Sequence, residues 1–271
     1  MKIDVIIPAK NPVSVFGEEI VKRSLDSVYA QTYSDWQILL CNYGDRKELE
    51  DLIAEYPQEK IKILDGATSF TNALNLGLKN ASGDLIARHD LDDFSDDDRF
   101  LKQVNYLKKN KKVKLVGTLG YSYNDEGIDY FPQNEKAIDY HDILQFFLQY
   151  NISQVVETNY VLNPFIHGSV MFYQNILTTI GLYNERYTQA QDLDLWCRIM
   201  KKYNAAIIPE RLYYWRNVPV STTNAKKEIT IKFGWEIFNK HLSELGARDA
   251  FISEKKNHQK VQESTRKARF F

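Results

Sequence analysis

Cysteine is scarce in this sequence. The 271 residues include two cysteines, Cys41 and Cys197, which lie far apart in apolar segments. Neither belongs to a CxxC pair, and no histidine lies beside them to complete a set of zinc ligands. We therefore expect no zinc site built on cysteine, and a protein that works in a reducing compartment, the cytoplasm.

Long apolar runs are absent as well. The first one, Ile3–Pro8, contains Asp4 and ends within a few residues, so it fits neither a secretory signal nor a membrane span. Basic and acidic residues nearly cancel, 35 against 36, so no overall field favours nucleic acid as the partner. The sequence also lacks a solenoid-type repeat and a low-complexity linker.

The first hundred residues repeat one unit, in which a short apolar run and a turn precede an amphipathic stretch with helical spacing. This alternation is typical of parallel βαβ units with right-handed crossovers. The predicted pairs are Ile3–Pro8 with 18–31, Gln37–Asn42 with 47–55, Lys60–Leu64 with 69–81, and Leu85–His89 with 96–109. The sequence predicts an α/β fold whose mostly parallel, Rossmann-like nucleotide-binding sheet is flanked by helices.

The order loosens after residue 118, and the second half is expected to cover one end of the first sheet. Further strands are predicted at 114–118, 168–172 and 205–208, a hairpin at 120–131, and helices at 141–150, 194–202 and 229–245. Residues 226–271 are expected to form a C-terminal helix and a basic tail.

Three carboxylates, Asp90, Asp92 and Asp93, directly follow the fourth apolar run. Ligands of open α/β sheets bind at the carboxyl ends of the strands. Carboxylates this close repel one another unless solvent or a hard cation relieves them, and Mg²⁺ or Mn²⁺ shared with substrate phosphates would do so. The pattern favours a metal–diphosphate site, whereas Asp96–Asp98 is interpreted as a helix start, where acids suit the dipole.

Two more acids, Asp192 and Asp194, open a later predicted helix. Two residues apart, they cannot share one helical face, so one is expected to act as a base and the other as a cap or structural pair.

The helical spacing of Trp196 favours core packing. Trp215 is the better candidate for stacking on a sugar, and His167 is interpreted as either a binding or a structural residue.

In this order the segments resemble the family 2 glycosyltransferases of the GT-A fold, inverting enzymes that build bacterial polysaccharides. The similarity covers about the first 220 residues and rests on an ordered set of motifs: Val5–Asn11, Ser24–Val28, Gln31–Tyr33, Asn72–Leu78, Ser82–Asp84, Ala87–Asp93 with Arg99, Phe165–Phe172, Gly181–Glu185 and Gln191–Trp196. The resemblance implies one GT-A domain over residues 1–225, with a nucleotide-sugar half (1–118) and an acceptor half (119–225).

The resemblance also implies an activity, the transfer of a sugar from a nucleotide diphosphate, favoured to be a UDP-sugar, to a hydroxyl of a glycan or lipid-linked acceptor. Asp192 would be the general base. Asp90 would contact the ribose or the metal, Asp92 would be the main ligand of Mn²⁺ or Mg²⁺, and Asp93 would support the cluster. Other donor contacts would come from Pro8, Ala9, Asn11, Asn42, Asn75, Arg88 and Arg216. The acceptor side would include His167, Gly168 and Trp215.

The chain departs from the family pattern at three positions. Asn42 stands where paired acids usually follow the second strand, so an amide would face the base N3–H and the preference for uracil becomes less secure. Gln191 replaces an acid before Asp192, which should leave Asp192 more acidic. Val218 stands where a histidine often follows the arginine, so the metal would have one protein ligand fewer and Arg216 would hold the diphosphate instead.

Two other classes of protein stay open. A nucleotidyltransferase would share the sheet and the metal acids, but it should carry a Gly- and Lys/Arg-rich loop after the first strand, and Ala9–Pro12 has one lysine and no glycine. A catalytically inactive nucleotide-sugar-binding module would explain the departures, yet the three metal acids and Asp192 are all retained.

The C-terminal tail raises the question of peripheral membrane contact. From Lys226 onward 11 basic residues accompany 6 acidic ones, and the chain ends in Phe270–Phe271. Each basic residue near an anionic leaflet contributes about 1 kcal/mol, while a solvated terminus contributes nothing. Vesicle co-sedimentation at low and moderate salt decides between the two. Loss of sedimentation on removing residues 253–271 would identify an anchor, and a full-length chain that stays in solution would exclude one.

Overall fold

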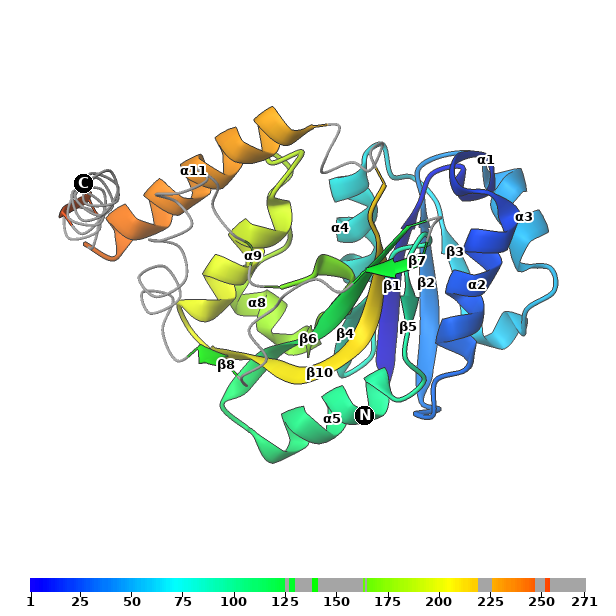
Figure 1. The fold of residues 1–271 in the computed structure, drawn as a ribbon, viewed down its shortest axis with the longest axis horizontal. Helices are drawn as coiled ribbons and strands as arrows, with labels where there is room; N and C mark the ends of the chain where they lie inside the picture. Colours follow the sequence, from blue (N-terminus) through cyan, green and yellow to red (C-terminus); the bar gives the residue numbers. More distant parts are fainter. Residues whose placement is uncertain are drawn as a thin grey trace, which may run out of the picture.

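The computed structural model describes residues 1–124, 127–129, 138–140, 163, 165–218, 226–246 and 252–253. Its strands form one ten-stranded mixed sheet in the order β3-β2-β1-β4-β9-β6-β10-β5, with β7 paired to β6 and β8 paired to β10 (Figure 1). The strands are β1 (Ile3–Ala9), β2 (Trp36–Asn42), β3 (Ile61–Leu64), β4 (Leu85–Arg88), β5 (Phe94–Ser95), β6 (Val113–Asn124), β7 (Gly127–Asp129), β8 (Ile138–Tyr140), β9 (Met171–Tyr173) and β10 (Asn204–Arg216).

Helices lie on both sides of this sheet (Figure 1). They are α1 (Pro12–Phe16), α2 (Glu18–Tyr29), α3 (Arg46–Ile53), α4 (Phe70–Asn80), α5 (Arg99–Lys109), α8 (Leu177–Ile180), α9 (Gln191–Met200) and α11 (Lys227–Glu244), with 3₁₀ turns η1 (Gln58–Lys60), η3 (His167–Ser169) and η4 (Gln174–Ile176). The βαβ units predicted over the first hundred residues are confirmed.

Strand β1 shows why these segments are apolar throughout. It is buried along its whole length. Ile3, Val5 and Ile7 belong to the core that contains the apolar faces of α2, α3 and α5, whereas Ile6 belongs to the core beneath α4, α8 and α9. Strands buried on both faces read as continuous hydrophobic runs, and helices must cover both sides of such a sheet.

The second half differs from the prediction around Gly168. The strand expected at 168–172 is wrong in its first part, because His167–Ser169 is a 3₁₀ turn and only Met171–Tyr173 pairs as a strand. The Gly168 carbonyl accepts from Arg99 Nη1 at 2.6 Å, and the Ser169 N–H bonds locally to Ile166 at 2.9 Å. The backbone here therefore uses side-chain and local partners in place of a strand ladder.

Other predicted elements are extended or lie outside the described residues. The short strands expected at 114–118 and 205–208 belong to the long parallel pair of β6 and β10. β6 and β7 form the predicted hairpin as far as Asn124 opposite Gly127. The helix expected at 141–150 and the tail from residue 254 onward fall outside the described residues.

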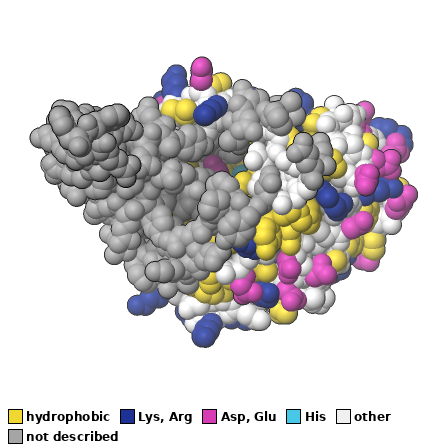
Figure 2. Space-filling model, viewed as in Figure 1, with side chains coloured by type: hydrophobic (Ala, Val, Ile, Leu, Met, Phe, Trp, Pro, Cys, Tyr) yellow, Lys and Arg dark blue, Asp and Glu magenta, His cyan; other side chains and the backbone are white. Residues whose placement is uncertain are grey.

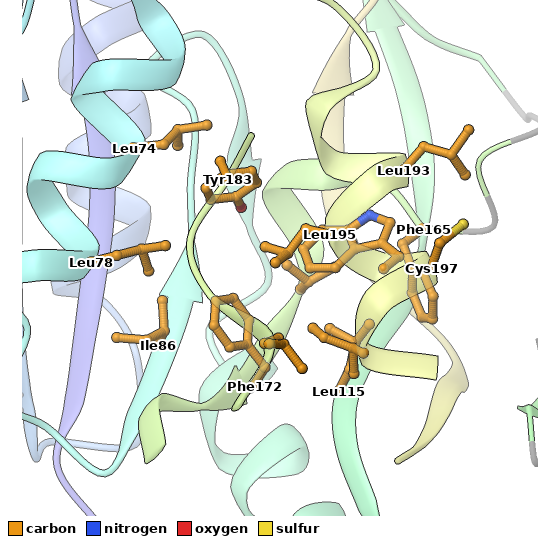
Figure 3. Packing of buried hydrophobic residues seen from close by; sticks show 14 of the residues in the cluster. Leu74, Leu78, Ile86, Leu115, Phe165, Phe172, Tyr183, Leu193, Leu195 and Cys197 are labelled. Carbon is orange, nitrogen blue, oxygen red and sulfur yellow. The ribbon is translucent and has the colours of Figure 1, made fainter. Parts of the chain in front are cut away.

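One of the two cores is centred on Trp196 of α9, which is fully buried. Its ring meets those of Phe165 and Phe172 edge to face, at centroid distances of 6.0 and 6.2 Å. Figure 3 shows part of this core, where side chains of α4, β4 and β6 converge with those of α9. Core packing of Trp196, predicted from its helical spacing, is confirmed.

The described surface carries mixed charge. In Figure 2 acidic and basic side chains alternate over the edge formed by α2 and α3, where Lys22 pairs with Glu18 at 2.9 Å and Lys47 pairs with Asp51. Among the described helices, none is long and apolar enough to span a bilayer.

Replacing Trp196 with alanine tests the packing of this core. We expect a loss of about 3–5 kcal/mol in the free energy of unfolding, because a large ring leaves a cavity among rigid neighbours. Trp235→Ala on α11, where the ring is half-buried, is the matched control and should cost clearly less. Urea unfolding followed by circular dichroism measures both, and equal losses would contradict the central position of Trp196.

Candidate active site

Three acids lie in the short loop between β4 and β5, at the carboxyl end of β4. Asp90 Oδ1 accepts a bond from Arg88 Nη2 at 2.6 Å, and the Asp90 side chain is 24 % exposed. No described residue bonds to its second oxygen, Oδ2. One oxygen of Asp90 is therefore fixed by Arg88, and the side chain keeps access to solvent.

Asp92 is partly buried, and no other residue in the described part of the chain forms a hydrogen bond with its carboxyl group. Burial raises the pKa of Asp92 to about 7, and the neighbouring charge of Asp90 adds to the shift. A carboxylate whose charge is this poorly compensated gains stability from a cation placed beside it.

Asp93 is 8 % exposed and bonds to β10. Its Oδ2 accepts from the Tyr213 hydroxyl at 2.8 Å, and its Oδ1 accepts from the Arg216 N–H at 2.7 Å. Burial, with the charges of Asp92 and Asp90, raises the pKa of Asp93 well above its usual range. Both oxygens hold the end of β10 against the acidic loop.

A divalent cation would therefore rest on few protein groups. Within the described part of the chain, no three His, Cys, Asp or Glu side chains are grouped so that they could hold a metal ion. Mg²⁺ in nucleotide sites is commonly held by one or two carboxylates together with substrate phosphates. Asp90 Oδ2 and the Asp92 carboxylate fit such a pair.

Arg88 lies beneath the acids and is only 1 % exposed. Its Nη1 donates to the carbonyls of Ile6 and His89 at 2.5 and 2.7 Å, and its Nε donates to His167 Nε2 at 3.3 Å. With Asp90 as the fourth partner, each of the three guanidinium nitrogens bonds to a protein group. Sequence reasoning assigned Arg88 to the donor, but the structure places it where it orients Asp90 and has no exposed donor group.

His167 links this centre to the second half of the chain. Its Nε2 accepts from Arg88 and lies 3.0 Å from the Tyr183 hydroxyl. Burial, reinforced by the charge of Arg88, holds the pKa of His167 well below its usual range, so the ring is neutral. Gly168 beside it leaves no room for a side chain, since a Cβ would lie 1.9 Å from the Tyr213 hydroxyl oxygen.

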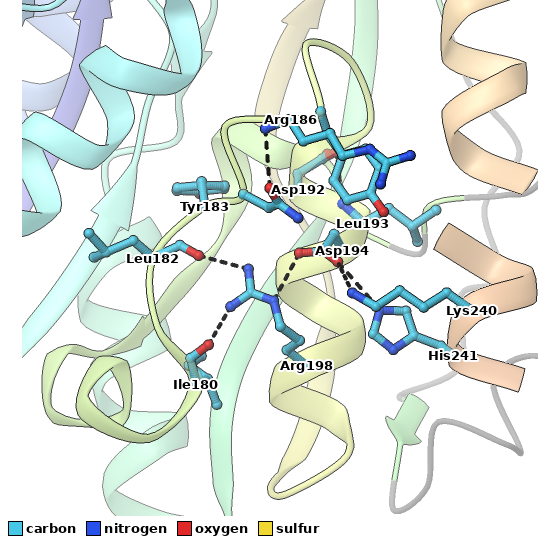
Figure 4. A network of polar contacts seen from close by, with 12 residues as sticks. Ile180, Leu182, Tyr183, Arg186, Asp192, Leu193, Asp194, Arg198, Lys240 and His241 are labelled. Atoms are coloured by element: carbon cyan, nitrogen blue, oxygen red, sulfur yellow. Dashed lines mark hydrogen bonds and ion pairs between the residues drawn. The ribbon is translucent and has the colours of Figure 1, made fainter. Parts of the chain in front are cut away.

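Asp192 lies in the first turn of α9 (Figure 4). Its Oδ2 accepts from Asn163 Nδ2 at 2.5 Å, and its Oδ1 accepts from the Leu193 N–H at 2.9 Å. Burial raises the pKa of Asp192 to about 6 although these bonds and the charge of Arg88 oppose the shift. Burial is thus the largest influence on the pKa of this carboxyl, and the effect of Gln191 in place of an acid stays a prediction.

Asp194 has a different role, as its spacing predicted. It is 1 % exposed, its Oδ2 accepts from Arg198 Nε at 2.8 Å, and its Oδ1 faces His241 Nε2 at 3.5 Å and Lys240 Nζ at 3.7 Å (Figure 4). Burial raises its pKa, but the contact with His241 and the two cations outweigh burial and hold the pKa below its ordinary value. Asp194 is the structural pair that ties α9 to α11.

Several predicted donor residues lie at the ends of β1 and β2. Pro8 and Ala9 are buried, and the Ala9 carbonyl accepts from the Tyr43 N–H at 3.0 Å. Asn11 is held in the left-handed region at φ 47°, and its Oδ1 accepts from the Asp45 N–H at 2.7 Å. The structure thus brings these backbones together where a nucleotide could approach them.

The other residues predicted to contact the donor or the acceptor are Asn75 and two residues at the end of β10. Asn75 is 3 % exposed, and its amide bonds both the N–H and the carbonyl of Tyr183 at 2.9 and 3.0 Å, so it holds the loop before α9. Trp215 and Arg216 are partly buried at the end of β10. The Arg216 N–H donates to Asp93 Oδ1 at 2.7 Å, so this residue lies beside the acidic loop, and its charge lowers the pKa of Asp92.

Sequence reasoning gave no separate role to Tyr183, Tyr213 or Asn163. Tyr183 lies inside the marked motif Gly181–Glu185, and Tyr213 precedes Trp215 by two residues, but their hydroxyl groups bond to His167 and Asp93 in other segments of the chain. Asn163 precedes a proline, a turn signal that would have drawn attention to it. Its contact with Asp192 depends on tertiary structure alone.

Comparisons with known proteins agree with this geometry. Residues 4–170, more than half of the chain, match the sequence model of glycosyl transferase family 2. EpsE of Bacillus subtilis, provisionally named a glycosyltransferase, is 27 % identical over 207 residues, 72 % of this chain and 68 % of EpsE. The amylovoran biosynthesis glycosyltransferase AmsE of Erwinia amylovora is 26 % identical over 186 residues, 67 % of this chain and 64 % of AmsE. The chain spans about two thirds of the length of these relatives.

Solved structures share the fold at low sequence identity. The 1–349 fragment of S. aureus TarS in complex with UDP superimposes with a TM-score of 0.61 at 15 % identity, covering 90 % of this chain and 72 % of TarS. The same fragment with UDP-GlcNAc gives 0.60 at 15 % identity, covering 90 % and 73 %. This likeness confirms the GT-A fold. Together with the family match, it shows that the chain belongs to glycosyl transferase family 2 and is a glycosyltransferase.

Proposed function

We propose that the chain transfers a sugar from a UDP-sugar to a hydroxyl of a glycan or lipid-linked glycan, with inversion at the anomeric carbon. The observation that carries the proposal is the position of Asp192. Its partly buried carboxyl lies in the first turn of α9, and the charge of Arg88 lowers the pKa of this carboxyl. Arg88 also holds Asp90 and His167. The UDP complexes of TarS and the polysaccharide role in the name of AmsE support the choice of donor and product class.

Asp192 suits the role of the base because its carboxyl is fixed yet not neutralised by a cation. Asn163 and the Leu193 N–H each occupy one lone pair and leave others for an acceptor hydroxyl. As the hydroxyl oxygen forms its bond to the anomeric carbon, its proton passes to Asp192. The bond between that carbon and the diphosphate oxygen breaks on the opposite face, and the electron pair leaves with the diphosphate.

The leaving diphosphate needs positive charge, and two sources are at hand. Arg216 lies on the acidic side of the site, and Asp90 Oδ2 with Asp92 would hold Mn²⁺ or Mg²⁺. A bound divalent cation neutralises charge that develops on the leaving oxygen. Asp93 keeps β10, and with it Arg216, at the required place. Trp215 and His167 would line the acceptor side.

An inactive donor-binding module is the alternative within the family. It would keep the sheet and the acids but would not turn over a donor. Slow hydrolysis of a UDP-sugar in the presence of Mn²⁺, measured as released UDP, separates the two, because an active site transfers to water when no acceptor is present.

Asp92→Asn should abolish the metal-dependent part of nucleotide binding. We expect the fold to stay intact and the affinity for UDP in Mn²⁺ to fall by at least about ten-fold, to its metal-free level, because the main ligand has been lost. Isothermal titration with and without Mn²⁺ measures this. Asp97→Asn, an exposed acid of the following turn, is the matched control. UDP affinity that responds to Mn²⁺ equally in the wild type and Asp92→Asn would refute the metal assignment.

Asp192→Asn should leave UDP binding intact while transfer falls by about 10²–10⁴-fold, since only the proton acceptor is lost. In the wild type, kcat should rise with pH through about 6, where Asp192 ionises. Transfer near the wild-type rate would move the base elsewhere.

A stability measurement checks the same carboxyl independently. An acid whose pKa is raised on folding stabilises the fold most at low pH, and this contribution is lost as pH rises through about 6. Asp192→Asn should therefore unfold at the same or a higher temperature than the wild type at pH 8. A clear loss of stability at pH 8 would show that the charged carboxylate is needed structurally.

A further inference from the structure

Asn163 is the one side chain in the described part of the chain that forms a hydrogen bond with the carboxyl group of Asp192. Its Nδ2 donates to Asp192 Oδ2 at 2.5 Å, and the other oxygen, Oδ1, accepts from the Leu193 N–H at 2.9 Å. The Leu193 contact lies within α9 itself. Asn163 therefore supplies the contact that holds the carboxyl from outside its own helix.

The amide of Asn163 is fixed in one orientation. Its Oδ1 accepts from the Phe165 N–H at 3.1 Å, so the Nδ2 end of the same amide faces Asp192. An amide turned the other way would place its oxygen against the carboxylate and leave the Phe165 N–H without this acceptor. The two hydrogen bonds therefore define which end of the amide meets Asp192.

Phe165 anchors this segment to the helix that carries Asp192. Its side chain is 4 % exposed, and its ring meets that of Trp196 on α9 edge to face at 6.0 Å. On another side Phe165 packs so closely on Gly117 that a Cβ there would lie 2.7 Å from Phe165 Cδ1. Because a close-packed ring cannot shift far, the amide of Asn163 is held at a fixed distance from α9.

An amide orients a carboxylate without supplying a positive charge. At Asp194, His241 and two cations outweigh burial and hold the pKa below its ordinary value. Asp192 forms no ion pair with a described residue, and burial raises its pKa to about 6. The carboxylate of Asp192 is thus oriented by a neutral group and can still accept a proton near neutral pH.

The groups that face Asp192 keep one charge state near pH 6. Arg88 of β4 faces it and remains charged. Burial raises the pKa values of Tyr183, in the loop before α9, and of Cys197, on α9, so both stay neutral. The pKa of His167, beside Tyr183, is held well below its usual range by burial. A change of protonation near pH 6 at this end of α9 therefore reports Asp192.

We propose that Asn163 is a positioning residue for the reaction, and that its amide orients the Asp192 carboxylate toward the acceptor hydroxyl. This inference rests on the proposed role of Asp192 as the base. With one lone pair of each carboxylate oxygen occupied, the direction of the remaining lone pairs is fixed. Misplacing a reacting group by about 1 Å can cost about 10²-fold in rate, so a residue that does not touch the substrate can still control kcat.

Two substitutions test the contact itself. Asn163→Ala removes the donor, whereas Asn163→Asp keeps the shape and the acceptor for the Phe165 N–H but turns a second carboxylate toward Asp192. The hydrogen bond favours the charged form, so its loss should raise the pKa of Asp192, and a like charge should raise it further. NMR titration of the full chain with its aspartate carboxyl groups labelled with ¹³C measures these values, and Asp192→Asn assigns the signal.

The kinetic readout is a fall in kcat at unchanged KM for the donor. Release of UDP from UDP-GlcNAc and UDP-glucose in Mn²⁺, followed against pH, should show kcat about ten- to a hundred-fold lower in Asn163→Ala. The rise of kcat with pH should also move to higher pH. Asn80→Ala is the matched control, because this exposed amide bonds to the Leu76 carbonyl of its own helix, and it should match the wild type.

The outcomes separate this inference from the proposed function. An Asp192 pKa or a kcat that stays at the wild-type value in the Asn163 variants overturns the inference, while the base can still be Asp192. If circular dichroism shows that Asn163→Ala does not fold, the isosteric Asn163→Asp decides by the same two measurements. If the wild type releases no UDP, or if Asp192→Asn releases it at the wild-type rate, the proposed function is wrong and the inference fails with it.

Discussion

The buried guanidinium of Arg88 is the interaction on which the site depends. A charge removed from water is costly unless every donor finds a partner, and here the partners come from β1, from the acidic loop and from the 3₁₀ turn at His167. Arg88 therefore ties the acids that follow β4 to β1 and to the 3₁₀ turn at His167.

A second buried arginine extends this arrangement. Arg99 donates to the carbonyls of Gly168 and Arg88 at 2.6 and 3.0 Å, and its guanidinium lies 5.1 Å from the ring centre of Tyr213. Tyr213 in turn donates to Asp93. Two cations beneath three carboxylates offset part of their repulsion, so the acidic loop can stay folded before a ligand arrives.

Asp92, Asp93, Asp192 and Asp194 differ in what surrounds their carboxyl groups. Asp93 and Asp194 are buried and bonded to protein groups, so they position β10 and α9. Asp92 and Asp192 are partly exposed, and burial raises the pKa of both, a combination typical of groups that meet a ligand or exchange a proton; the pKa of Asp93 is raised as well, but both of its oxygens are bonded to β10. Sequence spacing separated Asp192 from Asp194, but it could not separate Asp92 from Asp93, because their difference comes from β10.

The parts of the fold that sequence predicted are those with strong periodicity. β1 to β4 are buried on both faces, so their apolar runs stand out, and α9 was marked by its spacing. The turn at His167 was missed because it depends on Arg99, and the burial of Arg88 was missed because its partners are backbone carbonyls.

The anomeric configuration of the product tests the account most directly. A base on α9 that deprotonates the acceptor opposite the leaving diphosphate requires single displacement. Proton NMR of the sugar first released or transferred from an α-linked UDP-sugar should therefore show the β anomer. Formation of the α anomer would contradict Asp192 as the base of an inverting site.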